Sequence, residues 1–365
     1  MDNVISLDLD KNEPLLASSL FDTVWYVPLE TSDNFLFSRI SHLKIHGPHA
    51  YFISDKSFFL FDTETGRGKV KISKLGDGPE GYSSLFDSNL DLAQNEIELL
   101  DNNAKKIVVY DMNGNFKHSI SLPFMSFAFT KTDKDSYWLY NNNLLSDACD
   151  CKIAHFNKKK NAIDEMYDKI DSHLAEYFFV EDENNLVKQG NHILYHASPS
   201  DKIYLIKPGK GIETNYVLDF GKYKAPDAFY ASNFRDIMEF VEAANKNNYV
   251  FEIPNFSVNE NMLAVACMKD GALYTTFNLK ASNQNITYSS FYDDFNFTKP
   301  LALDGKNMSF FLDDKYFYFI ITPEQFIDLA HESKNSEKTN QWIDDKGITE
   351  FSNPILVKCR LKIDL

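Results

Sequence analysis

The sequence predicts an all-β fold, a six-bladed β-propeller built from four-stranded antiparallel blades. Two observations lead to this prediction: a strand pair repeats six times along the chain, and few segments show a helical period. The 365 residues include 31 Phe and 19 Tyr, side chains that suit pleated, half-buried surfaces. We therefore expect residues 1–365 to form a single propeller domain.

The repeat consists of an apolar-aromatic strand, a polar turn and a second strand, often followed by Asp, Asn or Gly. Equivalent positions in the first four copies lie about 46 to 50 residues apart, a period typical of propellers and solenoids; they are Phe61, Tyr110, Phe156 and Ile206. Each pair also has a strand before it and one after it, as "SNLDLA" and "FKHSISL" flank the second copy. Four strands per copy favour a propeller, because a solenoid uses fewer.

The two ends of the chain are predicted to share one blade. The last copy stops at "LVKCRLKIDL" without a fourth strand, and "TVWYVPLE" precedes the first copy without a partner. We expect Val24–Leu29 to pair beside Ile355–Leu361, which would close the ring and cover the edges of the blade.

Two helical insertions interrupt the later copies, at about residues 225–248 and 322–340. The second is predicted to begin with a capping box, in which Thr322 caps the helix and Gln325 returns the bond, with Pro323 in the first turn. In the first insertion, one apolar helical stripe is predicted to pack onto the propeller. It consists of Phe234, Ile237, Met238 and Val241.

Composition and net charge bear on the partners of the chain and on its location. The net charge of -16 argues against a nucleic-acid partner, because phosphate contacts need a basic face. No run approaches the ~20 apolar residues of a membrane span, and "MDNVISLDLD" lacks the regions of a secretory signal. Four cysteines define neither a disulfide framework nor a compartment.

The stretch Gly76–Gly81 has the form G-x-G-x-x-G, with Asp101 at a spacing found in dinucleotide-binding folds. A nucleotide loop needs a helix that opens at its last glycine, and the residues that follow here have no helical period. Pro79 also removes one N–H group from such a cradle. We therefore interpret this stretch as a glycine-rich link between the first two blades, and we predict no nucleotide cofactor.

The pattern of "YVPLE", strand pairs that end in "FD", "YD" or "NG", and "GDGPEG" at the first link resembles a family of Bacteroidetes propellers. That family is six-bladed and related in shape to NHL and TolB propellers, and the resemblance covers nearly the whole chain. Its members are often secreted lipoproteins, so the resemblance implies a periplasmic or cell-surface location and a lipid anchor. It offers no catalytic motif, and Asp77 stands where relatives carry arginine.

One face of the predicted propeller is expected to carry the function. The turns between the second and third strands of each blade and the links between blades emerge on the same face. Four segments fall there: 76–81, 141–151, 225–248 and 322–352. Loops on a rigid scaffold commonly carry binding residues. The predicted ligand-binding residues are Asp77, Glu80, Tyr230 and Trp342, aromatics for contact area and acids to orient a polar ligand.

Clusters of His and Cys were weighed as metal or catalytic sites, and none is predicted to be one. Cys149, Cys151 and His155 lack the usual zinc spacing and a fourth ligand nearby. A polar inner strand explains His42, His46 and His49, and His192 and His196 are explained in the same way. No G-x-S-x-G elbow is present, and paired acids such as Asp293 and Asp294 fit turns.

Two classes of function follow from this sequence. The favoured one is a non-enzymatic binding module that presents one face to a protein, peptide or glycan. The alternative is an enzyme with a site in the central channel, such as a metal-assisted lactonase-like hydrolase or a lyase. Inward carboxylates that ring a divalent cation would favour the enzyme.

Overall fold

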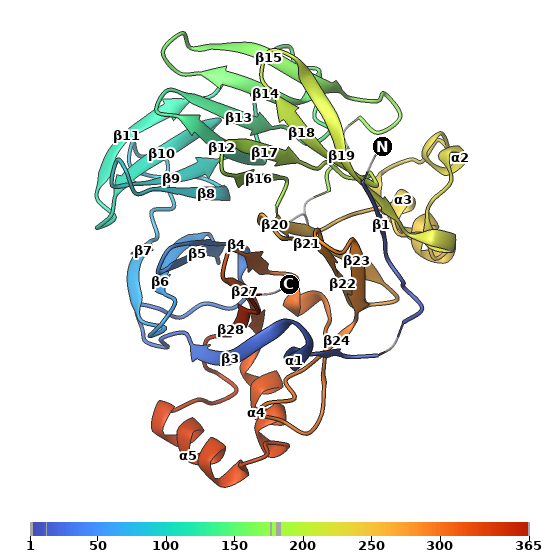
Figure 1. Cartoon of the computed structure of the whole chain (residues 1–365). Helices are drawn as coiled ribbons and strands as arrows, with labels where there is room; N and C mark the ends of the chain where they lie inside the picture. The colour runs from blue at the N-terminus through green and yellow to red at the C-terminus, as the bar shows by residue number, and fades with distance from the viewer. Residues whose placement is uncertain (1–2, 12, 176, 180–183, 364–365) are drawn as a thin grey trace. The chain divides into compact units, whose positions relative to one another are not determined.

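The computed structural model describes residues 3–11, 13–175, 177–179 and 184–363, and these residues form seven β-sheets and a few helices (Figure 1). Their contacts divide the chain into two compact units. Unit 1 comprises Met1–Ser6, Lys56–Phe58 and Ile72–Ile253. Unit 2 comprises Leu7–Asp55, Phe59–Lys71 and Pro254–Leu365.

Unit 1 contains three antiparallel sheets, each formed by four strands that follow one another in the chain (Figure 1). The first contains β8 (Leu85–Asp91), β9 (Glu96–Asp101), β10 (Lys106–Asp111) and β11 (Phe116–Ser121). The second contains β12 (Ala128–Asp133), β13 (Ser136–Tyr140), β14 (Cys151–Asn157) and β15 (Ala162–Lys169). The third contains β16 (Leu186–Gln189), β17 (His192–Tyr195), β18 (Lys202–Lys207) and β19 (Gly211–Asp219), and β1 (Asn3–Ser6) adds a parallel edge strand beside β19.

Unit 2 contains the other four sheets. One contains β4 (Ser41–His46), β5 (His49–Ser54), β6 (Ser57–Asp62) and β7 (Gly68–Ile72), although a few residues of β6 and β7 group with unit 1. Another contains β20 (Asn255–Val258), β21 (Met262–Lys269), β22 (Ala272–Leu279) and β23 (Gln284–Tyr288). The third contains β26 (Phe310–Leu312), β27 (Tyr316–Ile321), β28 (Ile355–Leu361) and β3 (Phe21–Pro28). The last has three short strands: β2 (Leu15–Leu16), β24 (Ser290–Tyr292) and β25 (Leu301–Ala302).

The predicted all-β fold with four-stranded antiparallel blades is confirmed, but the predicted number of blades was wrong. Counted as one blade per sheet, the described residues form seven blades rather than six. The additional sheet is the one formed by β2, β24 and β25, whose strands are two or three residues long. Strands this short cannot show an alternation of apolar and polar residues, so the repeat does not reveal them.

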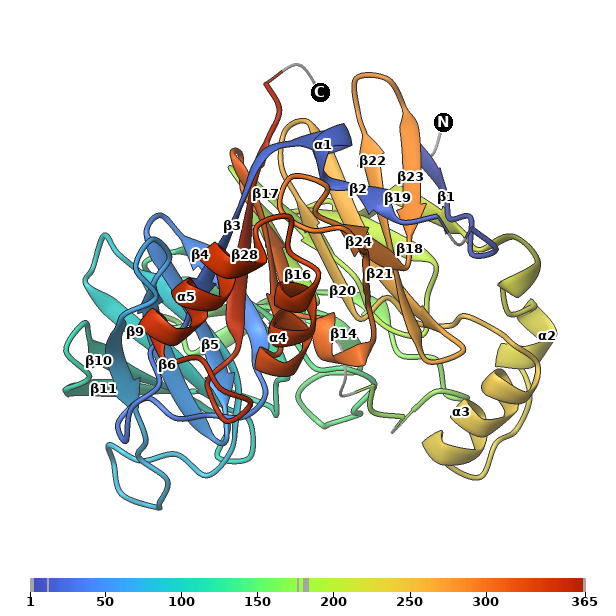
Figure 2. The same cartoon turned by 90° about the horizontal axis from the view of Figure 1, so that it is seen from below.

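The predicted pairing between the N-terminal strand and the last strand is confirmed. β3 pairs antiparallel with β28 from Ile355 opposite Pro28 to Leu361 opposite Phe21. The strand begins three residues earlier than Val24, because Phe21 is also buried in the apolar core of unit 2. β3 therefore supplies the fourth strand that the last copy of the repeat lacks (Figures 1 and 2).

The helices belong to the two predicted insertions, with short turns elsewhere. The first insertion contains α2 (Asp227–Tyr230) and α3 (Ile237–Lys246) and follows the short η1 (Gly221–Tyr223). The second contains α4 (Pro323–His331) and α5 (Ser336–Lys346). The remaining short helices are α1 (Ala17–Leu20) and η2 (Gly305–Asn307). The capping box at Thr322 and Gln325 is confirmed. The second insertion is longer than predicted, because the polar segment after α4 forms α5.

Two positions of the predicted apolar helical stripe were wrong: Phe234 precedes α3, and Met238 is not on its buried face. Met238 is 72% exposed, whereas Phe240 is fully buried. Asp236 caps the helix, so that Ile237, Phe240 and Ala244 follow one another at helical spacing on the inner face. Met238 lies about 100° around the helix from Ile237 and therefore points to solvent.

Candidate functional site

Four loops of unit 1 meet at one end of its sheets. They are the link from β13 to β14, the link from β15 to β16, the turn from β17 to β18, and the first helical insertion. Asn143 Nδ2 donates to Tyr177 O at 3.0 Å and to Ser198 O at 3.3 Å, and Asn142 Nδ2 donates to Phe179 O at 3.1 Å. We call this loop cluster the insertion face of unit 1.

An aromatic cluster fixes helix α3 to this face. Phe240 of α3 lies at its centre, with its ring centroid 5.1 Å from Phe229 and 5.2 Å from Phe251. Tyr177 packs against Phe240 and donates its hydroxyl to Phe234 O at 2.8 Å. The insertion therefore packs on Leu174, Tyr177 and Phe179 of the link from β15 to β16, whereas the sequence predicted packing on the blades. A buried aromatic cluster of this kind makes the insertion a fixed part of the surface.

A polar pocket of about 260 Å³ opens between the turn from β17 to β18 and the insertion. Its lining comes from the turn and β18, from the residues on either side of η1, from α2, and from the segment that follows α3. The lining residues are Pro199, Ser200, Asp201, Lys202, Tyr204, Phe220, Lys224, Asp227, Tyr230 and Val250. We call it the insertion pocket.

An ion pair crosses the insertion pocket. Lys224 Nζ lies 2.5 Å from Asp201 Oδ2, and this hydrogen bond raises the pKa of the Lys224 ammonium. Burial, followed by the charges of Asp201 and Asp227, raises the pKa of Tyr230 to about 12. Burial, followed by the charge of Asp168, likewise raises the pKa of Tyr204 to about 12. Both phenols therefore keep their hydroxyl protons near neutral pH and can donate hydrogen bonds.

Of the four predicted ligand-binding residues, Tyr230 lines this pocket. Asp77 and Glu80 are exposed in the link that follows β7, and Glu80 pairs with Lys74 at 3.2 Å. Trp342 lies in unit 2, where its ring packs edge-on against Phe326 at 5.5 Å and holds α5 against α4. The insertion pocket includes none of these three residues.

The sequence reasoning missed Asp201 and Lys224. Asp201 follows "ASPS" and has the composition of an ordinary turn, and Lys224 is one of many lysines. The available signal was strand order: the turn from β17 to β18 and the insertion emerge at the same end of one sheet. Because these two segments emerge together, an ion pair between a charged residue of the turn and one of the insertion could have been predicted.

The link at Gly76–Gly81 joins β7 to β8, strands of two different sheets, as predicted. A strand follows it, so its last glycine does not open a helix. A Cβ atom on Gly81 would lie 2.4 Å from Gly76 O, so the loop folds tightly on itself. Tyr82 is buried directly after it and donates its hydroxyl to a backbone carbonyl at 2.9 Å. This geometry explains the glycine at position 81 without a ligand.

The His and Cys residues weighed as metal ligands are not assembled into a site. Cys149 Sγ donates to Cys151 O at 3.1 Å, whereas His155 Nδ1 lies 2.6 Å from Asp164 Oδ1. Burial, followed by the neighbouring Asp150, raises the pKa of the Cys151 thiol to about 12. Across the described parts of the chain, no three His, Cys, Asp or Glu side chains converge as a metal ion requires.

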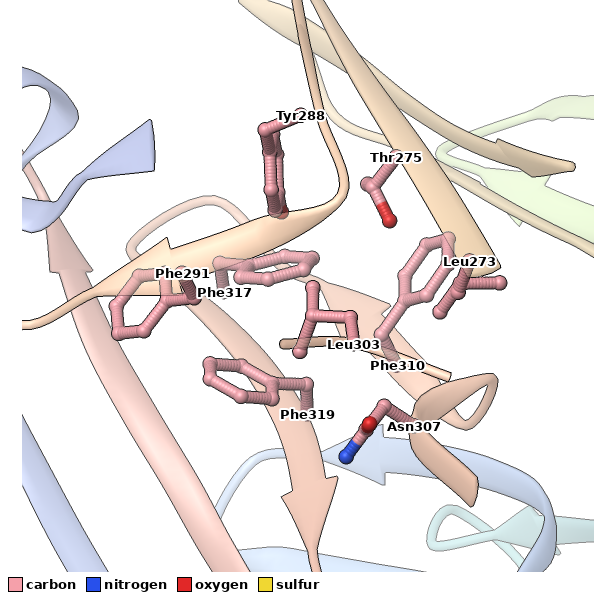
Figure 3. A pocket seen from close by; sticks show the side chains of 9 residues that line it. All are labelled: Leu273, Thr275, Tyr288, Phe291, Leu303, Asn307, Phe310, Phe317 and Phe319. Atoms are coloured by element: carbon pink, nitrogen blue, oxygen red, sulfur yellow. The ribbon is translucent and has the colours of Figure 1, made fainter. Parts of the chain in front are cut away.

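Unit 2 has a small apolar void beneath η2, shown in Figure 3. Leu273, Phe310, Phe317 and Phe319 surround it, and its volume is about 10 Å³. A space of this size holds one water molecule at most. It is therefore a feature of core packing and not a ligand site.

The four-stranded antiparallel sheets and their loop-borne pockets define the class: an all-β propeller with insertions. The chain belongs to the family described as "Domain of unknown function (DUF4934)", whose profile matches residues 2–360. The sequence matches no curated protein significantly. In residues 3–363, gaps excepted, no helix is both long and apolar enough to cross a membrane.

Two solved structures from Bacteroides share the fold. A protein of Bacteroides fragilis NCTC 9343 described as exported is 15% identical and has a TM-score of 0.76, with 98% of this chain and 99% of that chain covered. A member of the duf4221 family from Bacteroides vulgatus ATCC 8482 is 12% identical and has a TM-score of 0.55, with 93% and 97% covered. At these identities the likeness shows the fold alone.

Proposed function

We propose that this chain is a non-enzymatic binding module that presents the insertion face of unit 1 to a ligand, and that the insertion pocket is the contact point. The candidate ligands are a glycan, a peptide or a protein. The observation that carries the proposal is the pocket itself: it is polar, it has a volume of about 260 Å³, and a long insertion forms one wall. An insertion that adds chain length beyond a tight turn suggests a use other than folding.

The chemistry of the pocket favours a neutral, hydroxyl-rich ligand, and therefore a glycan. Asp201 and Asp227 balance Lys202 and Lys224, so the lining carries no net charge. A sugar hydroxyl can donate to the carboxylates and accept from the ammonium groups and from the phenols of Tyr204 and Tyr230. The tyrosine rings add flat apolar surface for the sugar ring at low cost in conformational entropy.

A glycan array followed by calorimetric titration tests this proposal. Tyr230→Phe removes one hydroxyl but keeps the packing of the ring on Phe229, and Asp201→Asn removes a charge from the pocket. We expect each substitution to weaken glycan binding about 3- to 30-fold, as the loss of one hydrogen bond to a neutral or charged group does. The matched controls are Tyr223→Phe and Asp219→Asn, which lie outside the lining and should leave affinity unchanged.

Failure would take two forms. If no glycan or peptide binds the wild-type chain, the binding proposal is wrong. If a ligand binds but the pocket variants match their controls, the insertion pocket is not the site.

We also propose that the chain acts in the periplasm or on the cell surface as a lipoprotein, and that residues 1–365 act as one domain. The exported relative from Bacteroides fragilis and the resemblance to lipoprotein propellers support this location. Cell fractionation with surface proteolysis tests it, and recovery in the cytoplasmic fraction would contradict it.

A further inference from the structure

A second pocket, of about 390 Å³, lies in unit 2 and takes no part in the proposed function. It opens where β27 begins, at the opposite end of that strand from helix α4. Three turns surround it: from β4 to β5, from β6 to β7, and from β26 to β27. The lining residues are Gly47, Pro48, Thr63, Glu64, Asp313, Asp314, Lys315, Tyr316, Tyr318 and Lys358. We call it the lysine pocket.

Lys358 is a buried cation beside this pocket. It lies in the middle of β28, directly opposite Trp25 of β3 on one side and Tyr318 of β27 on the other. Directly opposite residues point to the same face of a sheet, so the lysine stem is enclosed between rings. The Lys358 ammonium is 4.1 Å from the ring centroid of Tyr316, and its side chain is 4% exposed. This position allows it little freedom to turn toward water.

The partner of Lys358 is far less constrained. Glu64 Oε1 accepts a hydrogen bond from Lys358 Nζ, but the Glu64 side chain is 69% exposed. Hydrogen bonds to Asp62 Oδ1 fix the turn around Glu64 through the backbone N–H groups of Glu64 and Thr65. The glutamate side chain can therefore leave without disturbing its turn, whereas the lysine stays in place.

The other acids of the pocket do not compete for Lys358 in the same way. Asp313 Oδ1 accepts hydrogen bonds from the backbone N–H groups of Lys315 and Tyr316, each at 2.7 Å. Burial, followed by the charge of Asp313, raises the pKa of Tyr318, so this phenol stays protonated. Asp314 and Lys315 are exposed in the turn. Glu64 is thus the carboxylate that a ligand would have to replace.

We propose that the lysine pocket binds a carboxylate-bearing sugar, such as a hexuronic acid, by exchange with Glu64. The ligand carboxylate takes the position of the Glu64 carboxylate on the Lys358 ammonium, so no buried charge loses its partner. The ring of Tyr316, which lines the pocket, offers a flat surface for the sugar. A single carboxylate matches the single buried ammonium, whereas a doubly charged phosphate would meet repulsion from Asp313 and Asp314.

Calorimetric titration of the full chain with glucuronate, and with glucose as the neutral counterpart, tests this inference. We expect glucuronate to bind at least about tenfold more tightly than glucose. An ion pair to a buried partner contributes more to the binding free energy than an ion pair on the surface does. Glu64→Gln removes the internal competitor and should tighten glucuronate binding by about threefold or more. Lys358→Met keeps the bulk of the stem and should weaken binding at least about tenfold. Lys338→Met, on exposed α5, is the matched control and should have no effect.

Three results of these titrations would overturn the inference. Equal affinity for glucuronate and glucose, no binding of glucuronate, or weaker glucuronate binding by Glu64→Gln each overturns the inference. Circular dichroism checks the fold of Lys358→Met; if that variant unfolds, the Glu64→Gln titration alone decides. Because the insertion pocket is made of different residues, the effects of Glu64→Gln and Lys358→Met are independent of the glycan screen on unit 1.

Discussion

Gly81 is required by the close approach of two backbone segments, and its replacement should be costly. A Cβ atom at this position would lie 2.4 Å from Gly76 O and 3.1 Å from Lys74 O. The backbone of the link would have to move, so we expect Gly81→Ala to lower the free energy of unfolding by about 1–3 kcal/mol. Urea unfolding measures this change.

Gly78→Ala is the matched control for Gly81→Ala. It lies in the same link, and an added Cβ meets nothing within 4 Å. A loss of stability confined to Gly81→Ala supports the tight fold of the link, whereas equal effects would contradict it.

His196 should make stability depend on pH. It is fully buried, and burial lowers its pKa from 6.5 to about 4; the charge of Lys152 acts in the same direction and that of Asp201 opposes it. Between these values the unfolded chain binds a proton that the folded chain does not. The contribution of neutral His196 to the free energy of unfolding is therefore fully present above pH 6.5. It is lost as the pH drops toward 4, by up to about 3 kcal/mol.

Chemical unfolding at pH 7 and at pH 4.5, with wild type and His196→Gln, checks this prediction. The substitution should reduce the difference between the two pH values, whereas exposed His118→Gln should leave it unchanged. An equal difference in wild type and His196→Gln would show that other groups cause the pH dependence.

At the scale of single residues, the sequence shows which side chains lie in an insertion but not what each side chain packs against. Tyr230 was predicted because it lies in the insertion, and it does line a pocket. Trp342 was predicted for the same reason, yet its ring packs on Phe326. The sequence alone could have marked Lys358 as a candidate site residue, because a lysine between apolar neighbours in "PILVKCRL" is unusual for a strand interior. Its partner Glu64 lies in another sheet, and the sequence does not show which turn comes close.

The pairing of strand β3 was predicted from the sequence and is present in the structure. Removal of β3 should leave an unpaired edge on its sheet. Deletion of residues 1–30 exposes the edge of β28 and removes the buried Phe21, Val24 and Val27 from the core. We expect a large fall in melting temperature or failure to fold. Differential scanning calorimetry measures it.

Deletion of residues 1–14 is the control for this truncation. It removes β1, which forms an edge strand beside β19, and leaves β2 and β3 in place. It also removes the buried Ile5, Leu7 and Leu9, so we expect a measurable loss of stability, but a smaller one than deletion of residues 1–30 causes. If the two truncated chains have the same melting temperature, β3 is not the strand that stabilises its sheet.

At the scale of elements, prediction succeeded where a pattern was long enough to repeat. The paired strands of six to eight residues carry enough aromatic and β-branched side chains to be recognised, as in β6 and β10. The β2, β24 and β25 strands are too short for that, so their sheet was missed. Helix α5 extends beyond the predicted insertion, because its sequence is mostly polar and Trp342 is the aromatic residue that packs it on Phe326 of α4.

The charge of the whole molecule affects how each ligand is reached. A net charge of -16 repels polyanions at long range, so a nucleic acid should not bind even at low salt. A neutral glycan carries no charge for this field to act on. We therefore expect its affinity to change less than about twofold between about 0.05 and 0.5 M NaCl. Titration at both salt concentrations measures this, and a steep salt dependence would contradict a neutral ligand.

The central claim is that the insertion face of unit 1 is the binding surface of this propeller. Hydrogen–deuterium exchange with and without the tightest-binding glycan of the array tests it most directly. We predict slower exchange in residues 199–204 and 220–230. Exchange should be unchanged in the 112–115 turn, which joins β10 to β11 at the opposite end of the strands from the turns between second and third strands. Protection of the 112–115 turn, with residues 199–204 and 220–230 unaffected, would contradict the claim.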